Sequence, residues 1–357
     1  MFVAIRDLRF AKGRFALMGT VVTLITLLVV LLSGLTAGLG RGNTSAITDL
    51  PADHLVFSAP ATGQKLVFTE SSLAPSVQDR WARIPGVRQA NPVTVAMTRA
   101  RAGERTAGVA VFAVPPGSPL ARQVDTDQVV LSAKAAASLE VATGDSLELA
   151  GQPVTVAEVS GDDEFSHAPV IWAATTNAPA SGLEPEKATF LALRTDDGVD
   201  LAAADEVLGT QTLTPAESLA AIGSYTSENG SLQLMRGLLF AISALVIGAF
   251  FTVWTVQRSG EIAILKALGA STGYLLKDAL GQALALLAAG TALGTALAAG
   301  VGASITALAS TAVPFVLNLP TLMLPALVMV VLGLAGAAVS LRTVTTVDPL
   351  TALGSAR

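Results

Sequence analysis

The sequence predicts an α-helical membrane protein with four transmembrane helices and an α/β extracytoplasmic domain inserted between the first and second helix. Three observations lead to this prediction. Of the 357 residues, 52% are hydrophobic and only 14% are charged, whereas soluble domains carry about 25% charged residues. Long charge-free runs occur near the N-terminus and in the C-terminal third. A polar segment, residues 41–232, separates the first run from the others.

The charge-free runs define the expected spans. Residues 15–40 and 237–257 carry no charged side chain, and about 20 apolar residues suffice to cross the hydrocarbon core as a helix. The run 279–341 is long enough for two crossings, and Pro314 and Asn318 favour a turn within it. The expected spans are residues 15–40, 233–257, 278–312 and 321–342, with a short extracytoplasmic turn at 313–320.

Basic residues beside the spans predict the orientation. Residues 1–14 carry four basic side chains, and their apolar residues recur at helical spacing, which indicates a cytoplasmic amphipathic helix. The loop at 258–277 carries Arg258, Lys266 and Lys277, and Arg342 and Arg357 lie at the end of the last span and in the tail. We therefore expect a multi-pass plasma-membrane protein with both termini in the cytoplasm.

Residues 41–232 have the mixed pattern of an α/β domain. Alternating or β-rich runs predict strands at His54–Ser58, Lys65–Thr69, Val93–Thr98, Gly108–Val114, Ser146–Leu149 and Val154–Val159. Helical periodicity predicts helices at Ser76–Arg83, Ala133–Leu139 and Leu201–Leu208.

Several chemical functions are excluded by missing residues and motifs. The chain has no cysteine and only two histidines, so thiolate sites and histidine-rich metal sites are ruled out. Its net charge of -5 argues against a nucleic-acid binder. No phosphate-binding G-x-x-x-x-G-K-[ST] loop and no hydrolase motif occurs. We therefore expect no catalytic residue, no metal site and no intrinsic cofactor.

The acidic run near His167 and the other histidine, His54, are not interpreted as ligand sites. Asp162 to Glu164 with His167 could suggest a cation site, but a solvated acidic turn is the favoured interpretation. His54, at a predicted strand start, is interpreted as an ordinary surface or edge residue.

The loop after the second span predicts a short amphipathic helix that ends at Gly269, a residue suited to a helix C-terminus. Glu261 in its first turn and Lys266 in its last turn match the helix dipole. An exposed apolar helix of this kind would dock a partner, or would be a connector lying in the lipid headgroups.

The run from Arg258 to Ser271 resembles the coupling loop of ABC-transporter permeases of the FtsX-like/MacB superfamily. Val129–Val159 is similar to a stretch of the family's outer domain, and Val347–Leu353 resembles its terminal element. The outer domain is therefore expected to be MacB-like. Within the family the chain is most similar to the haem-exporting (Hrt-type) and DevC-like permeases. It departs from the family at Gln282, often a glutamate, and at Gly354, often a basic residue.

The resemblance implies a permease subunit of an ATP-driven efflux pump that acts with two copies of a cytoplasmic ATP-binding subunit, which would bind ATP and Mg²⁺. It also implies a second permease, as a homodimer or with a paralogue, and contact with membrane lipid but not with nucleic acid. Coupling to the ATPase would involve Arg258, Glu261, Ile262, Leu265, Lys266, Leu268 and Gly269. The expected cargo is haem or another amphipathic compound. Export of antibiotics, peptides or lipids, and a mechanotransmitter that moves no cargo, remain alternatives.

A haem cargo requires ligands near the membrane. The candidates are Tyr225, Glu228, Met235 and Arg236, of which Arg236 would pair with a propionate. Glu228 and Met235 are seven residues apart and would share one face of a continuous helix. The same residues could equally form a polar and aromatic cuff at the end of a span. Gly290 and Gly294 form a G-x-x-x-G motif that suits close helix packing between protomers or within one.

Overall fold

The structure is a computed structural model that describes residues 12–121, 123–176, 187–257, 260, 264, 268–309 and 313–345. It divides into a helical unit, Met1–Gly38 with Ser231–Arg357, and an outer unit, Leu39–Gly230. The amphipathic helix expected at residues 1–14 lies outside the described residues except for its last three positions. The terminal element at Val347–Leu353 and Gly354 also lie outside them.

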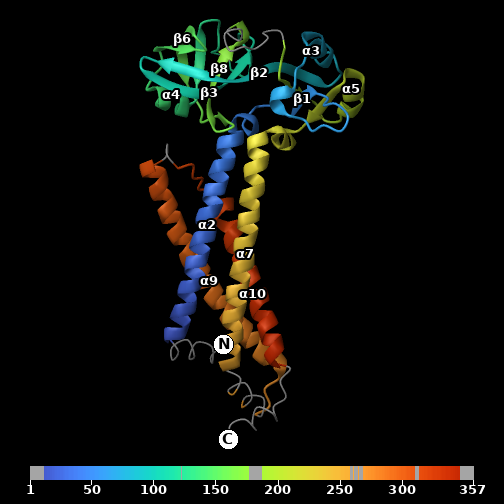
Figure 1. Cartoon of the computed structure of the whole chain (residues 1–357). Helices are drawn as coiled ribbons and strands as arrows, with labels where there is room; N and C mark the ends of the chain where they lie inside the picture. Colours follow the sequence, from blue (N-terminus) through green and yellow to red (C-terminus); the bar gives the residue numbers. More distant parts are fainter. Residues whose placement is uncertain are drawn as a thin grey trace. The chain divides into compact units, whose positions relative to one another are not determined.

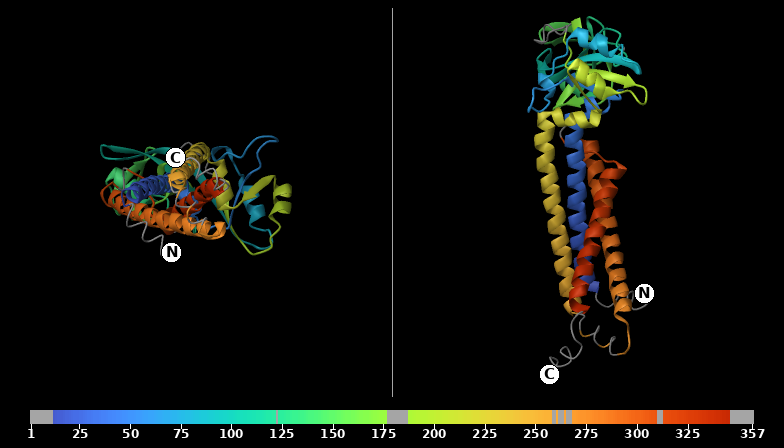
Figure 2. Two further views of the ribbon diagram at one scale, coloured as in Figure 1. Left: turned by 90° about the horizontal axis from the view of Figure 1, so that it is seen from below. Right: turned by 90° about the vertical axis from the view of Figure 1, so that its right-hand side faces the viewer.

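Four long helices run side by side in the helical unit (Figures 1 and 2). They are α2 (Lys12–Thr48), α7 (Gly223–Gln257), α9 (Thr272–Ala309) and α10 (Leu319–Thr345). Each contains a segment long and apolar enough to cross a membrane, which confirms the four predicted transmembrane helices. Helices α2 and α7 extend past the expected limits of residues 40 and 233. Charge-free length marks only the apolar part of a helix, whereas the helical backbone continues through polar residues, which are buried at the end of α2 and exposed or half-buried at the start of α7.

Small residues bring α9 against α2 within this chain. Thr23 Oγ1 donates a hydrogen bond to the Gly290 carbonyl at 3.2 Å. A Cβ on Gly294 would lie 2.5 Å from the Thr23 carbonyl oxygen. The G-x-x-x-G motif is therefore used for packing within one protomer, which decides between the two alternatives that the sequence left open.

The turn between α9 and α10 packs against α2. Phe315 is buried against Gly34 of α2 and Gly302 of α9, and the Val316 backbone nitrogen donates to the Gly34 carbonyl at 3.1 Å. Gly38 faces the Pro314 carbonyl so closely that a Cβ would overlap it. The turn expected at 313–320 therefore packs closely on α2, at positions where only glycine leaves room for it.

A closed six-stranded barrel forms one part of the outer unit, because β5 pairs with β2 as well as with β6. Its strands in pairing order are β2 (Val87–Ala102), β3 (Arg105–Val114), β8 (Ala168–Ala174), β4 (Gln128–Leu131), β6 (Gln152–Val159) and β5 (Ser146–Leu149). Helix α4 (Ala133–Leu139) contributes Ala135 and Leu139 to the core that these strands share. Successive residues of β3 contribute in turn to this core and to the larger apolar core of the outer unit, so both faces of β3 are buried.

The first half of β2 belongs to a second sheet, in which it pairs with β9 (Phe190–Thr195), β1 (His54–Ser58) and β10 (Thr210–Leu213) in that order. Helices α3 (Pro75–Trp81) and α5 (Leu201–Leu208) contribute Trp81 and Leu208 to the small core on this sheet. Figure 1 shows α3, α5 and β1 at one end of the outer unit and the barrel at the other. Short helices at Pro215–Ser218 (α6) and Leu219–Ala221 (η3) lead into α7. The predicted α/β extracytoplasmic domain and the fold class are confirmed.

One predicted strand is wrong. Lys65–Thr69 forms no strand, and its end enters a 3₁₀ helix, η1 (Phe68–Glu70). Phe68 is buried edge-on against Phe57 and Phe190, with ring centroids 4.8 and 5.7 Å away. The segment is therefore anchored by one aromatic side chain instead of by pairing with a sheet. The alternation rule missed β8 and β9, because strands buried on both faces are continuously apolar.

Candidate functional site

A hairpin of the outer unit holds the C-terminal end of α2. Strands β7 (Glu164–Phe165) and β8 are joined by Ser166 and His167, which both have positive φ, 52° and 63°. The Ser166 backbone nitrogen donates to the Asn43 carbonyl and that of His167 to the Gly42 carbonyl, each at 3.0 Å. These bonds offset the cost of the left-handed backbone, and they fix the His167 side chain beside α2.

The four side chains of Asn43, His167, Ser224 and Glu228 form a cluster, here called the Asn43 cluster. His167 Nε2 lies 2.7 Å from Glu228 Oε2. Asn43 Nδ2 donates to Glu228 Oε2 at 2.9 Å and lies 2.8 Å from His167 Nε2. Ser224 Oγ donates to Asn43 Oδ1 at 2.7 Å. The cluster joins the end of α2, the β7–β8 hairpin and the start of α7.

The protonation of His167 decides how the cluster is bonded. A neutral imidazole whose Nε2 has no proton can accept from Asn43, whereas a protonated Nε2 donates to Glu228. The His167 and Glu228 side chains are 38% and 41% exposed, so solvent screens their ion pair. Asn43 is only 1% exposed. The Asn43 amide is the most buried group of the Asn43 cluster, so we expect its hydrogen bonds to contribute most to the stability of the cluster.

The predicted haem-site residues divide between the two units. Tyr225 and Glu228 belong to the outer unit, and Met235 and Arg236 to the helical unit. Tyr225 packs against the larger apolar core of the outer unit. Met235 is 49% exposed, and α7 is continuous from Gly223 to Gln257, so Glu228 and Met235 lie on one unbroken helix. The structure brings Glu228 together with His167 and Asn43, two residues that sequence reasoning did not select.

No sequence signal could have found this grouping. Asn43 and Glu228 are 185 residues apart, and His167 was set aside with the neighbouring acidic run. That run is not simply a solvated turn, because Glu164 pairs with Lys134 and Asp163 accepts from the Trp172 indole. Among the described residues, no group of three or more potential metal ligands occurs. His54 begins β1, an internal strand that pairs with β9 and β10, and its half-buried side chain has Nδ1 3.4 Å from Thr195 Oγ1.

The predicted coupling loop is described only in part. Arg258, Glu261, Ile262, Leu265 and Lys266 lie outside the described residues. Ile264 and Leu268 are 61% and 79% exposed, and the Leu268 backbone nitrogen donates to the Ile264 carbonyl at 3.0 Å, a helical hydrogen bond. Gly269 follows with φ +96°. This left-handed conformation is the one expected of a glycine that ends a helix.

Two family models together match most of the chain. The model of the MacB-like periplasmic core domain matches residues 16–210, and the model of the FtsX-like permease C-terminal region matches residues 234–349. The chain belongs to the FtsX-like/MacB superfamily of ABC-transporter permeases. Permease subunits of this kind are not themselves catalytic, and they work with a separate ATPase subunit.

Curated relatives match this permease over its whole length. A putative hemin transport system permease protein HrtB of Staphylococcus epidermidis is 26% identical over 361 residues, covering 99% of each chain. The protein of the same description from Staphylococcus haemolyticus is 25% identical over 364 residues, with the same coverage. An uncharacterized ABC transporter permease of Mycobacterium bovis is 26% identical over 368 residues, again covering 99% of each chain.

Two solved structures are similar to part of the permease. The periplasmic region of MacB from Actinobacillus actinomycetemcomitans has a TM-score of 0.36 and 12% identity, covering 48% of this chain and 92% of that one. The extracellular domain of the transporter YknZ from Gram-positive bacteria has a TM-score of 0.35 and 14% identity, covering 45% and 98%.

Asn43→Ala is expected to destabilise the permease by about 2 to 3 kcal/mol, because Glu228 loses a charge-assisted hydrogen bond and the Ser224 hydroxyl loses its acceptor. Thermal unfolding of the full chain in detergent measures the effect. The matched control is Gln64→Ala, which removes an exposed carboxamide and should leave the midpoint unchanged. Equal midpoints for the two variants would contradict a structural role of the Asn43 cluster.

Proposed function

We propose that this permease is the membrane subunit of an ATP-driven efflux pump that exports haem or a similar amphipathic compound. The observation that carries the proposal is the end-to-end match to permeases described as putative hemin transport proteins. The match covers the outer unit as well as the spans. It does not favour a mechanotransmitter, and the uncharacterized mycobacterial relative leaves other cargoes as outcomes of the test.

The pump would contain two copies of a cytoplasmic ATP-binding subunit and two permeases, with both termini of each permease in the cytoplasm. The exposed side chains of Ile264 and Leu268 support a docking surface in the loop before α9. Burying a leucine side chain contributes about 1.5 to 3 kcal/mol, so each of these two residues could contribute to a contact with the ATP-binding subunit. We further propose that the pair of permeases is a homodimer and that neither has a cofactor of its own.

Glu228 and the neighbouring His167 are the groups that we propose to meet the cargo first. Imidazole is a common haem ligand, and His167 Nε2 is 2.7 Å from Glu228 Oε2. Both contacts of the Glu228 carboxylate within the Asn43 cluster use Oε2. Glu228 Oε1 has no contact within the cluster and could bind haem iron while these hydrogen bonds remain, whereas His167 Nε2 could bind iron only by giving up its contact with Glu228. Tyr225, one turn before Glu228 on α7, and Met235 and Arg236, farther along it, remain proposed contacts.

An absorption titration tests the cargo directly. Haemin is added to the purified permease in nanodiscs, and the Soret band is followed. We expect a saturable shift at about one haem per permease pair, as a site on a two-fold axis would give. Glu228→Ala and His167→Ala should weaken binding about tenfold or more if the side chain ligates iron.

The chain offers matched controls for both variants. His54 is the only other histidine in the sequence, and His54→Ala should leave the Soret titration unchanged. Glu206→Gln removes an exposed carboxylate of α5 and should also have no effect. A titration without a saturable shift would reject haem as the cargo. A shift that neither Glu228→Ala nor His167→Ala alters would reject this pair as its ligands.

A further inference from the structure

A cavity of about 360 Å³ opens in the outer unit between three segments. They are the end of α2 with the residues that follow it, the loop from β3 to β4, and the sheet formed by β4, β6 and β8. None of the residues of the Asn43 cluster lines the cavity. Its wall combines apolar and acidic side chains, a combination that neither the family models nor the relatives assign to a function.

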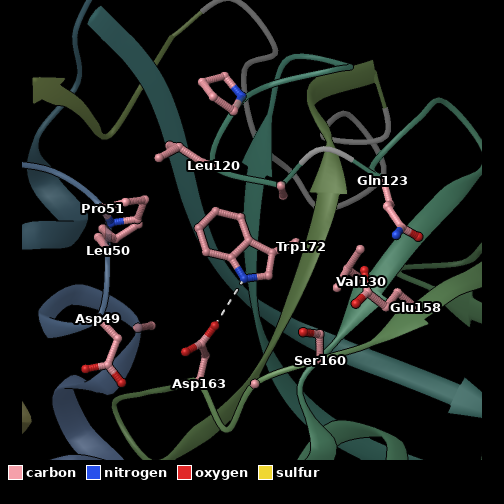
Figure 3. A pocket seen from close by; sticks show the side chains of 14 residues that line it. Asp49, Leu50, Pro51, Leu120, Gln123, Val130, Glu158, Ser160, Asp163 and Trp172 are labelled. Atoms are coloured by element: carbon pink, nitrogen blue, oxygen red, sulfur yellow. Dashed lines mark hydrogen bonds between the residues drawn. The ribbon is translucent and has the colours of Figure 1, made fainter.

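The apolar part of the wall is rigid. Trp172 of β8 is 7% exposed and rests on Phe112, with ring centroids 5.2 Å apart. Figure 3 shows the indole between Leu120 and Pro51 on one side and Asp163 on the other. A body of alkyl or aromatic carbon could lie against these groups, and the contact with Phe112 holds the indole in place.

The acidic part of the wall comprises Asp163, Asp49 and Glu158. Asp163 Oδ2 accepts a hydrogen bond from Trp172 Nε1 at 3.4 Å. Burial raises the pKa of the Asp163 carboxyl, and the nearby Asp49 carboxylate adds to this effect although Arg41 opposes it. Arg41 is bound to Asp49 at 2.8 Å. Among the residues that the structure describes, neither Asp163 nor Glu158 forms a salt bridge, so a cation bound beside them would not have to displace one.

We propose that this cavity binds small organic cations in which a protonated amine is attached to an alkyl or aromatic body. The ammonium group would lie beside Asp163, and its body would cover Trp172 and Leu120. The proposal does not depend on haem export, because it concerns other residues and another class of ligand.

The test uses the full-length permease in nanodiscs and isothermal titration with 4-phenylbutylamine. The control ligand, 4-phenylbutanol, has the same body without the charge. We expect saturable binding of the amine and binding of the alcohol at least tenfold weaker, since a hydrogen bond to a charged group accounts for about a tenfold difference or more. Equal affinity for the two compounds, or saturable binding of neither, would overturn the proposal.

A conservative variant tests whether the amine binds in this cavity. Asp163→Asn keeps an oxygen that can accept from Trp172 Nε1 but removes the charge. It should weaken binding of the amine about tenfold without lowering the thermal midpoint. The control Glu104→Gln removes an exposed carboxylate from the turn between β2 and β3 and should bind the amine as the parent does. Unchanged affinity of Asp163→Asn would show that the amine binds elsewhere and would overturn the assignment.

Discussion

Replacing Gly38 by alanine is expected to destabilise the helical unit by about 3 kcal/mol or to prevent its folding. A Cβ at this position would overlap the Pro314 carbonyl and lie 2.8 Å from the Phe315 backbone nitrogen. Both obstacles are backbone atoms, which cannot rotate away as the end of a side chain can. Phe315 would have to leave its place against Gly34, and its buried ring would lose that packing.

This change is measured by thermal unfolding in detergent. The readout is the monodisperse fraction in size-exclusion chromatography. The matched control is Gly300→Ala on α9, where a Cβ meets nothing within 4 Å. Because alanine has the higher helix propensity, the control should be neutral or slightly more stable. If Gly38→Ala unfolds at the same temperature as the control, the turn between α9 and α10 does not pack on α2 as described.

Replacing Leu268 by aspartate is expected to separate the permease from its ATP-binding subunit and to abolish ATP-driven export. Leu268 is 79% exposed and lies one helical turn from Ile264, which is 61% exposed. A carboxylate in place of an apolar anchor both removes the burial of leucine and places an unpaired charge in the contact. Co-purification of the tagged ATP-binding subunit and its stimulated ATPase activity are the two measurements.

A second exposed leucine supplies the control for this experiment. Leu319, the first residue of α10, is 71% exposed and lies at the far end of α9 from Leu268. Leu319→Asp introduces the same charge at a helix N-terminus, where a carboxylate is tolerated. It should insert normally and retain the ATP-binding subunit. Retention of the subunit and of transport by Leu268→Asp would exclude the loop before α9 as the coupling site.

Features that depend on local composition were predictable from the amino-acid sequence. A span is recognised by the length of a charge-free run, so the four transmembrane helices were predictable without knowledge of their neighbours. A strand with one buried face alternates, as β5 does, and β5 was predicted with its observed bounds. The bounds of β1 were also predicted, although its three central residues are all buried. The resemblance at Arg258–Ser271 indicated the family before any fold was known. A glycine that ends a helix is also a local signal, and Gly269 has the expected left-handed backbone.

Contacts between residues distant in the sequence became known from the three-dimensional fold. Gly38 reads like any other helical glycine until Pro314 is placed against it. Asn43 and His167 carry no pattern of their own, and they join Glu228 because the β7–β8 hairpin turns at a left-handed pair of residues. The acidic side chain of Asp163 looks solvated in the sequence but is partly buried beside Trp172. Contacts of this kind depend on how the chain closes over long separations, which local periodicity does not encode.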